Sequence, residues 1–266
     1  MNARVVEGPP FEGDNAGRGR SGPPAEEVRM RGSVARVVML GGALGLVGPA
    51  AGAGTIAGTV HYVGKVPNLK PLSVSAEPVC AKMHPTVPNE ALVLGSGDTM
   101  ANVVVRVTKG LAAGKTWPAP KEPVVMDQKG CQYIPHVMGL MVGQPFKVLN
   151  SDGILHNVHA LPKVNRQFNM AMPPTRKEAI ETFTKAEGMF TVKCDVHPWM
   201  QAFVGVFTHP FFSVTKTDGK YSIGDLPAGT YEIEAWHERL GTQTSSVTVG
   251  ATETKPVDFK FSPPSK

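Results

Sequence analysis

Two short clusters of histidine, cysteine and methionine stand out in the middle of the sequence. The first is LHNVH at 155–159, and the second is CDVHPWM at 194–200. Together they offer thiolate, imidazole and thioether ligands. Soft sulfur combined with imidazole suits copper, above all as a trigonal set of two histidines and one cysteine with a weak axial methionine. Carboxylates, which calcium or magnesium would need, are not concentrated here. Zinc also accepts cysteine and histidine, but a methionine ligand argues against it.

The spacing within the second cluster allows one short loop to present three ligands. Cys194 ends an alternating apolar segment, His197 and Met200 lie on the loop that follows, and Pro198 limits the freedom of that loop. His156 would complete the set from the loop of a neighbouring strand. We therefore expect a single copper ion bound by two imidazoles, one thiolate and one thioether.

The segments that must hold these ligands show the period-two alternation of half-buried β-strands. Valine, isoleucine, threonine, phenylalanine and tyrosine dominate them, and turn sequences such as NSDG at 150–153 and DG at 218–219 separate them. No segment shows a helical stripe. The sequence therefore predicts an all-β protein whose many short strands pack as two β-sandwiches. The expected strands are 55–63, 102–107, 145–149, 179–184, 189–194, 202–207, 230–236 and 243–249.

The segment 118–209 resembles a cupredoxin, and its ligand loop is similar to that of the amicyanins. The resemblance lies in HNVH at 156–159, in the Cys-x-x-His-x-x-Met pattern at 194–200 and in LMVGQPFKVLN at 140–150. It implies a Greek-key β-sandwich with one type 1 copper site, whose outer partners orient the ligands. The implied ligands are His156, Cys194, His197 and Met200, with Asn157 tying the two ligand loops together.

Two departures from the amicyanin pattern lie next to the cysteine. Asp195 stands where cupredoxins often have a small hydroxyl residue, and its carboxylate would favour the oxidised metal. Pro198 and Trp199 imply a bulkier apolar rim than usual. We place Trp199 at the rim of the site, in an exposed apolar patch around His197. We expect electrons to pass through the exposed edge of His197, with a redox partner docked on this patch.

The segments on either side resemble one transthyretin-like, carboxypeptidase-regulatory-like β-sandwich. The likeness is carried by TDGKYSI at 217–223 and LPAGTYEI at 226–233, in which tight turns lead into strands. This domain would comprise 54–117 and 210–262, with the cupredoxin domain inserted in it or packed beside it. Three sequential modules are the alternative. A sandwich of this kind indicates fold and says little about function.

Three further histidines are interpreted as structural. His159 points away from the ligand set, His136 ends a strand, and His209 lies at the domain junction. The tripeptide WHE at 236–238 has no nucleophile near it in the sequence, and we interpret it as the end of a strand.

Residues 1–53 are expected to lie outside the fold. Residues 1–28 show no strand or helix period. After them come three arginines, an apolar stretch at 37–50 and the small residues AGA at 51–53, which is the order of a secretory signal peptide. Because such signals begin at the N-terminus, we expect translation to start at Met30. An uncleaved membrane anchor is the alternative, although the stretch is short and glycine-rich. The mature chain would then have no membrane span and be periplasmic or otherwise exported.

Export would place the chain in an oxidising compartment, where disulfides persist. The sequence has 3 cysteines. With Cys194 on the metal, Cys80 and Cys131 remain as one pair that would staple the outer sandwich to the cupredoxin domain. The formal net charge of +5 is mild and the basic residues are scattered, so a nucleic-acid partner is not expected.

These features predict an exported blue copper protein that transfers single electrons and is not an enzyme. A rigid β-scaffold suits this function because it limits the rearrangement of the ligands when copper changes oxidation state. The amicyanin likeness implies a redox partner protein, a dehydrogenase or a cytochrome, which the sequence does not identify. Two alternatives stay open. One is a copper-binding or delivery module without redox turnover, and the other is a structural cell-envelope protein whose sandwich binds a carbohydrate or a partner.

Overall fold

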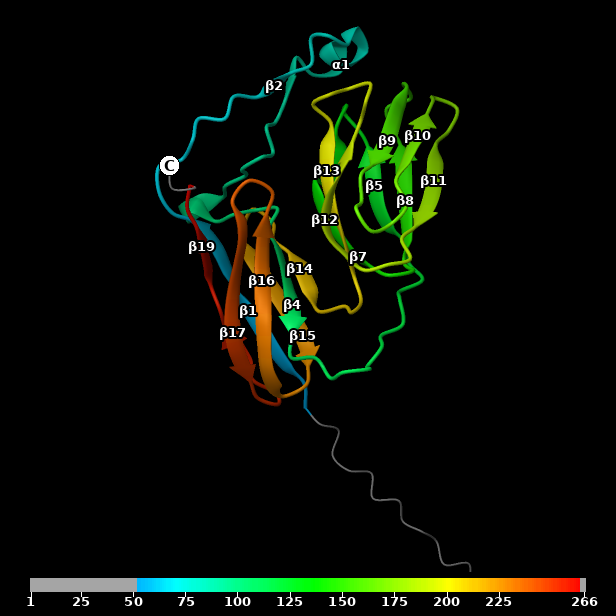
Figure 1. Cartoon of the computed structure of the whole chain (residues 1–266). Helices are drawn as coiled ribbons and strands as arrows, with labels where there is room; N and C mark the ends of the chain where they lie inside the picture. The colour runs from blue at the N-terminus through cyan, green and yellow to red at the C-terminus, as the bar shows by residue number, and fades with distance from the viewer. Residues whose placement is uncertain (1–51, 264–266) are drawn as a thin grey trace, which may run out of the picture. The chain divides into compact units, whose positions relative to one another are not determined.

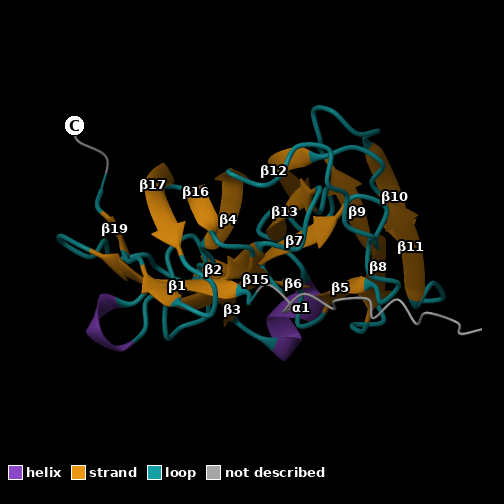
Figure 2. Cartoon of the chain, turned by 90° about the horizontal axis from the view of Figure 1, so that it is seen from below, coloured by secondary structure: helices purple, strands orange, loops and turns teal. Residues whose placement is uncertain are grey.

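The structure, a computed structural model, describes residues 52–263 of the chain. The signal peptide expected before residue 54 falls almost entirely outside this range, as does Met30. Strands make up nearly all of the regular structure between 52 and 263, and the helices are short (Figure 2). The expected all-β class is therefore confirmed. No helix in this range has the length and hydropathy needed to cross a membrane.

Strands between 124 and 207 form two sheets, here called the inner sandwich. One sheet has the order β10-β9-β12-β13-β7, and the other has the order β11-β8-β5-β6. Side chains from both sheets, such as Phe146 and Val192, share one buried core. The strands are β5 (Val124–Gln128), β6 (Tyr133–Ile134), β7 (Val137–Met141), β8 (Pro145–Asn150), β9 (His156–Ala160), β10 (Phe168–Met172), β11 (Glu178–Thr182), β12 (Glu187–Lys193) and β13 (Gln201–Phe207).

Strands from both ends of the described chain form two further sheets, here called the outer sandwich (Figure 1). β1 pairs antiparallel with β15 and parallel with β18 and β19. The second sheet has the order β14-β4-β16-β17, and a separate apolar core that includes Ile56 and Ile233 lies between the sheets. The strands are β1 (Gly54–Tyr62), β4 (Val104–Lys109), β14 (Phe212–Val214), β15 (Lys220–Leu226), β16 (Gly229–His237), β17 (Gly241–Val249), β18 (Thr254–Pro256) and β19 (Phe259–Phe261).

These pairings place residues before and after the inner sandwich in common sheets. The transthyretin-like identity of the outer sandwich stays a prediction, as do the boundaries 54–117, 118–209 and 210–262.

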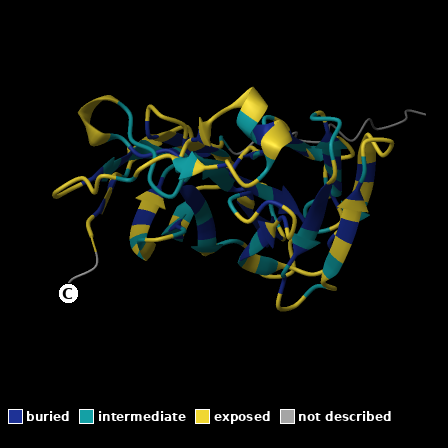
Figure 3. Cartoon of the chain, turned by 90° about the horizontal axis from the view of Figure 1, so that it is seen from above, coloured by how far each residue is buried: buried dark blue, intermediate teal, exposed yellow. Residues whose placement is uncertain are grey.

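The alternation of residue types explains why these segments are strands. Along β16, Tyr231, Ile233 and Ala235 are buried, whereas Glu232 and Glu234 between them are half-buried. Successive side chains of a strand point to opposite faces of its sheet, so this pattern turns one face toward the core. Figure 3 shows the same bands of buried and exposed residues along the strands.

Between β1 and β4 the chain runs through a connecting segment, residues 63–103. It contains β2 (Leu72–Ser73), α1 (Pro78–Met83), β3 (Thr86–Val87) and the 3-10 helix η1 (Ser96–Asp98). The side chain of Glu77 accepts a hydrogen bond from the Val79 N–H and so caps α1, and Pro78 occupies the first turn. A helix of six residues is too short to produce an apolar stripe, so the sequence pattern shows no sign of α1.

The disulfide expected from cysteine parity is present between Cys80 and Cys131. It joins α1 to the turn between β5 and β6, and therefore anchors the connecting segment to the inner sandwich.

Candidate metal centre

The pairing of β9 with β12 brings the two sequence clusters together. These strands are antiparallel, with Lys193 opposite His159. The start of β9 and the end of β12 therefore meet at the same end of the sheet. His156 is the first residue of β9, and Cys194 directly follows β12.

Backbone hydrogen bonds close the loop from Cys194 to Met200. The Cys194 N–H donates to the Met200 carbonyl at 3.1 Å, and the Met200 N–H donates to the His197 carbonyl at 2.9 Å. The His197 N–H donates to the Cys194 Sγ at 3.4 Å. These contacts fold the loop back on itself and leave Met200 buried.

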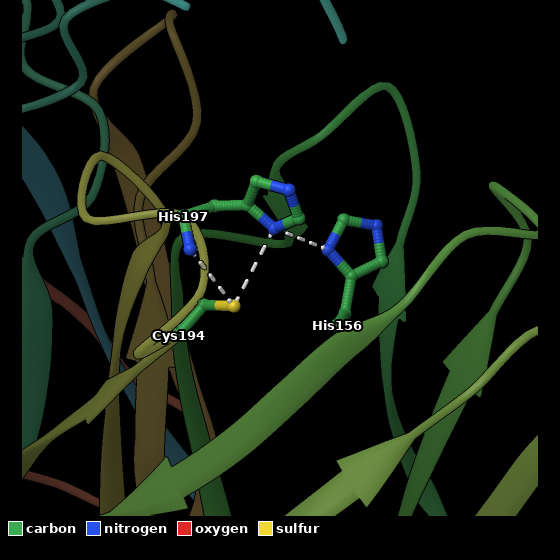
Figure 4. Close-up of side chains that lie close together, drawn as sticks. All are labelled: His156, Cys194 and His197. Atoms are coloured by element: carbon green, nitrogen blue, oxygen red, sulfur yellow. Dashed lines mark hydrogen bonds between the residues drawn. The ribbon is translucent and has the colours of Figure 1, made fainter. Parts of the chain in front are cut away.

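Three of the four expected ligands converge on one point (Figure 4). His156 Nδ1 lies 2.9 Å from His197 Nδ1, which in turn lies 3.6 Å from Cys194 Sγ. Each of the three side chains is at most 2% exposed. The structure thus forms an enclosed cluster of two imidazoles and one thiol.

The far nitrogen of each imidazole faces a carboxylate. His156 Nε2 lies 2.9 Å from Asp152 Oδ2, and His197 Nε2 lies 4.0 Å from Glu77 Oε2. The Asp152 carboxylate accepts a hydrogen bond at this distance, so it holds a proton on His156 Nε2, whereas Glu77 lies beyond hydrogen-bond distance from His197. With its proton on Nε2, the neutral His156 ring has its Nδ1 lone pair free to bind a metal ion.

Asp152 is itself held in place by the turn between β5 and β6. The N–H groups of Gly130 and Cys131 donate to its two oxygens at 2.6 and 2.8 Å. Both residues have positive φ angles, which points their N–H groups the same way. Burial raises the pKa of Asp152, but hydrogen bonds from His156, Cys131 and Gly130 outweigh burial and lower it, so the carboxylate is ionised.

The surroundings of Cys194 favour its thiolate form. Burial raises the pKa of the Cys194 thiol, but hydrogen bonds that the sulfur accepts from His156, from His197 and from the backbone outweigh burial and lower it to about 6. A thiolate, and not a thiol, is the species that binds metal. Cys194 is also the free cysteine of the described residues.

The donor set fits a soft metal cation. Two imidazole lone pairs and a thiolate that face one another at these distances repel unless a proton or a cation lies among them. Two imidazoles and one thiolate suit copper, and zinc also accepts them. A second group, Cys131, Asp152 and His156, also lies close together. It has no free thiolate to offer, because Cys131 is bonded to Cys80.

Asn157 connects the two ligand-bearing segments. Its Oδ1 accepts hydrogen bonds from the Asp195 N–H at 2.7 Å and the Val196 N–H at 3.4 Å, and lies 3.2 Å from Cys194 Sγ. Its backbone carbonyl accepts a hydrogen bond from the Tyr133 hydroxyl.

Asp195 does not present an uncompensated charge to the cysteine. Its carboxylate contacts Lys193 Nζ at 3.0 Å and His159 Nδ1 at 2.9 Å, and it accepts a hydrogen bond from Asn169 at 2.7 Å. Lys193, then Asn169 and His159, hold the pKa of Asp195 at about 2. The effect of this carboxylate on the oxidation state of a bound metal stays a prediction.

The expectation of an exposed His197 edge was wrong. His197 is 1% exposed, because Glu77 at the start of α1 faces its outer nitrogen and the Trp199 ring lies 5.3 Å away. Trp199 itself is half-buried, and its Nε1 donates to the Cys131 carbonyl at 3.0 Å. The disulfide holds α1 in this position, so the connecting segment covers what would otherwise be the open side of the ligand loop.

Sequence reasoning missed Asp152 and Glu77 as partners of the two imidazoles. Asp152 precedes His156 by four residues within NSDG, which we interpreted only as a turn. Glu77 lies 120 residues before His197, and no local pattern links them. The other histidines lie outside the cluster: His136 contacts Glu238, and the His209 ring packs against Trp117.

Comparisons with known proteins find similarity in structure only. No family model matches the chain, and no curated protein sequence matches it. A copper-containing nitrite reductase from Thermus scotoductus is 22% identical over 37% of this chain and 25% of its own, with a TM-score of 0.30. An oxidised amicyanin mutant is 23% identical over 40% of this chain and 98% of its own, with a TM-score of 0.29. A purple cupredoxin from Nitrosopumilus maritimus is 20% identical over 31% of this chain and 97% of its own, with a TM-score of 0.26. These TM-scores are too low to support an argument about function, so the case for a metal centre in this chain is made from its own donor atoms.

Proposed function

We propose that this chain is an exported, mononuclear copper protein that carries single electrons and is not an enzyme. The observation that supports this most is the convergence of His156 Nδ1, His197 Nδ1 and Cys194 Sγ, all buried. We further propose Met200 as a weak axial ligand, because the closed loop that carries Cys194 and His197 ends on it.

When bound, copper would supply a centre that gains and loses one electron. The residues of this chain would limit the structural change that accompanies each transfer. Asp152 keeps the proton of His156 on Nε2, and Asn157 ties β9 to the loop after β12 through two backbone N–H groups. Burial excludes water from the ligand atoms. Such outer contacts orient metal ligands and tune their affinity.

The Cys80–Cys131 disulfide supports an exported location, because disulfides persist in oxidising compartments. The partner would be a redox protein, a dehydrogenase or a cytochrome, in keeping with the amicyanin likeness of the ligand loop. Since His197 is covered, that partner would dock either over the connecting segment or at another face of the inner sandwich.

The test is a titration of the purified, metal-free protein with Cu(II), followed by visible absorption and electron spin resonance. We expect one equivalent to bind with strong thiolate-to-copper charge transfer, and Cys194→Ser to abolish that band. His197→Gln should also abolish it, whereas the matched control His209→Gln, outside the cluster, should leave it unchanged. A colourless complex, or a band that survives Cys194→Ser, would contradict the proposal. Binding of zinc in preference to copper would contradict it equally.

The coverage of His197 favours a second candidate, copper storage or delivery without redox turnover. A ligand shielded by Glu77 and Trp199 exchanges electrons slowly, because the donor and acceptor stay farther apart. A redox titration of the copper-loaded protein separates the two candidates. Reversible cycling between Cu(I) and Cu(II) supports the electron carrier, whereas a Cu(I) form that resists oxidation supports delivery.

A further inference from the structure

A cavity of about 290 Å³ lies in the outer sandwich, away from the ligand cluster. Its walls come from the end of β1, the connecting segment and the turn after β16. This volume is close to the lower limit of ligand sites, which span roughly 300–1,000 Å³. Its lining is mostly apolar, with Tyr62, Leu92 and Leu240 among the apolar residues, and it also includes Lys65, His237 and Arg239.

His237 lines this cavity and has a buried, unpaired ring nitrogen. The side chain is 1% exposed, and its Nδ1 accepts a hydrogen bond from the Arg239 N–H at 3.3 Å. That contact places the ring proton on Nε2, which is buried and has no hydrogen-bond partner. Buried polar groups are nearly always paired, so an unpaired donor beside a cavity calls for an acceptor.

The neutral state of His237 is consistent with this tautomer. Burial lowers the pKa of the imidazole to about 4. The ring is therefore uncharged at neutral pH and offers one N–H group.

The charge of the lining favours an anion. Lys65 and Arg239 both line the cavity and are exposed, and none of the lining residues is acidic. The neighbouring carboxylates Glu238 and Glu90 face His136 instead, at 2.6 and 3.7 Å. The two cations therefore have no carboxylate partner within the cavity.

We propose that this cavity binds a small monocarboxylate with an apolar body, such as an aromatic or branched aliphatic acid. The His237 Nε2–H would donate to a carboxylate oxygen, Arg239 and Lys65 would supply the positive charge, and the leucines and Tyr62 would enclose the apolar part. The site uses no residue of the metal centre. The proposal therefore does not depend on the proposed copper function.

The test uses the full, metal-free protein and a panel of small carboxylates, together with related molecules that are uncharged or positively charged. Benzoate, phenylacetate and hexanoate are titrated by calorimetry, with benzamide and benzylamine as uncharged and cationic counterparts. The resonance of the His237 side-chain nitrogen is followed in parallel. We expect at least one carboxylate to bind with a Kd of about 1 mM or tighter and to shift the Nε2 resonance. Benzamide and benzylamine should bind at least about tenfold more weakly.

Two variants and a matched control test the roles of Arg239 and His237. Arg239→Gln should weaken carboxylate binding about tenfold and leave benzamide binding unchanged. Lys260→Gln, an exposed cation that does not line the cavity, is the matched control and should have no effect. His237→Phe should weaken carboxylate binding by a similar factor. If this buried variant fails to fold, the Arg239 variant and the Nε2 resonance of the wild-type protein still test the proposal.

The proposal is overturned if no carboxylate of the panel shifts the Nε2 resonance. It is also overturned if benzamide binds as tightly as benzoate, or if Lys260→Gln weakens binding as much as Arg239→Gln.

Discussion

The two sandwiches differ in what they bury. The inner sandwich encloses polar side chains, with His156, His197 and Asn157 gathered at one end of a sheet. The outer sandwich encloses an almost wholly apolar core, and its buried polar residues are Thr215 and His237. Burying polar groups costs free energy unless they are hydrogen-bonded. At the ligand cluster, hydrogen bonds such as those of His156 and Asn157 offset this cost.

The hydrogen bonding of the buried polar groups also differs between the ligand cluster and His237. At the ligand cluster each imidazole has a carboxylate beyond it, and Asn157 is hydrogen-bonded to the ligand loop. Among the described residues, the buried side-chain atoms without a hydrogen-bond partner are Asp127 Oδ1, Gln128 Oε1 and Asn150 Oδ1 in the inner sandwich and His237 Nε2 in the outer sandwich. The imidazole nitrogens of the ligand cluster are thus not among the unpaired atoms, whereas the outer nitrogen of His237 is.

The largest expected effect tests whether the outer core serves stability alone. Ile233 is fully buried between the outer sheets. Ile233→Ala should lower the free energy of unfolding by about 4 kcal/mol, because it removes packed atoms and leaves a cavity. Copper binding measured below the unfolding transition should not change. Ile180→Ala, at a site that is 59% exposed in the inner sandwich, is the control and should cost about 0.5 kcal/mol or less. A loss of copper binding in Ile233→Ala would show that the two regions are not separable.

The next effect concerns the link between the connecting segment and the inner sandwich. The disulfide closes a loop with a sequence separation of 51 residues. Replacing Cys80 and Cys131 by alanine should lower the free energy of unfolding by about 3 kcal/mol, through greater freedom of the unfolded chain. It should also release α1 from His197. Denaturant unfolding measures the first effect, and the rate of His197 modification by diethyl pyrocarbonate measures the second.

Val79→Ala, at an exposed position of α1, is the matched control for the double substitution. It should change neither the unfolding free energy by more than about 0.5 kcal/mol nor the modification rate. If His197 reacts equally slowly in the protein without the disulfide, the disulfide does not hold the cover in place.

Replacing Asp152 tests how strongly the hydrogen bonding of the ligand cluster depends on one carboxylate. Asp152→Ala leaves His156 Nε2 and the N–H groups of Gly130 and Cys131 without their acceptor. We expect a loss of about 2.5 kcal/mol in unfolding free energy. Copper affinity should fall roughly 10–100-fold. Ser151→Ala in the same turn removes only an exposed hydrogen bond to Asp127. If both variants cost the same, Asp152 acts through the turn and not through His156.

The strands and the ligand loop could be predicted from the sequence because their causes are local. Alternation over 230–236 reflects the two faces of one strand, now β16 (Gly229–His237). The spacing of Cys194, His197 and Met200 fits one short loop. The disulfide followed from counting cysteines once Cys194 was assigned elsewhere.

What could not be predicted depends on contacts between distant parts of the chain. Glu77 covers His197 only because the disulfide and the packing of the connecting segment bring α1 there. His237 appeared in the sequence as the end of a strand. Its missing partner becomes visible only when the surrounding cavity is known. Asp152 belongs to a turn and also contacts His156, and the sequence pattern predicts only the turn.

Lowering the pH should reduce the stability of the protein through His237 of the outer sandwich. Burial lowers the pKa of this imidazole from 6.5 to about 4, so below pH 6.5 the unfolded chain takes up a proton that the folded chain does not. Stability therefore falls as the pH decreases, by about 2 kcal/mol between pH 7.5 and pH 5 from this residue. Unfolding free energies of the wild-type protein and His237→Phe, measured at both pH values, isolate the contribution.

The variant comparison is needed because His136 titrates in the opposite sense. Burial lowers the pKa of His136, but the hydrogen bond and charge of Glu238 outweigh burial and raise it. Its stabilising contribution is present at low pH and is lost as the pH rises through the raised pKa. If His237→Phe shows the same fall in stability as the wild-type protein, His237 is not the group that resists protonation.

The smallest effect belongs to the ion pair between Arg106 and Glu234 on neighbouring strands of the outer sandwich. Their nitrogen and oxygen lie 2.9 Å apart, with side chains that are 28% and 21% exposed. Solvent screens such a pair, so Glu234→Gln should lower the unfolding free energy by only about 0.5 kcal/mol. Raising the salt concentration should remove the difference between the two proteins, since screening weakens the wild-type pair alone. A loss comparable with that of Ile233→Ala would mean that charge pairs, and not the apolar core, stabilise the outer sandwich, and the contrast between the two regions would disappear.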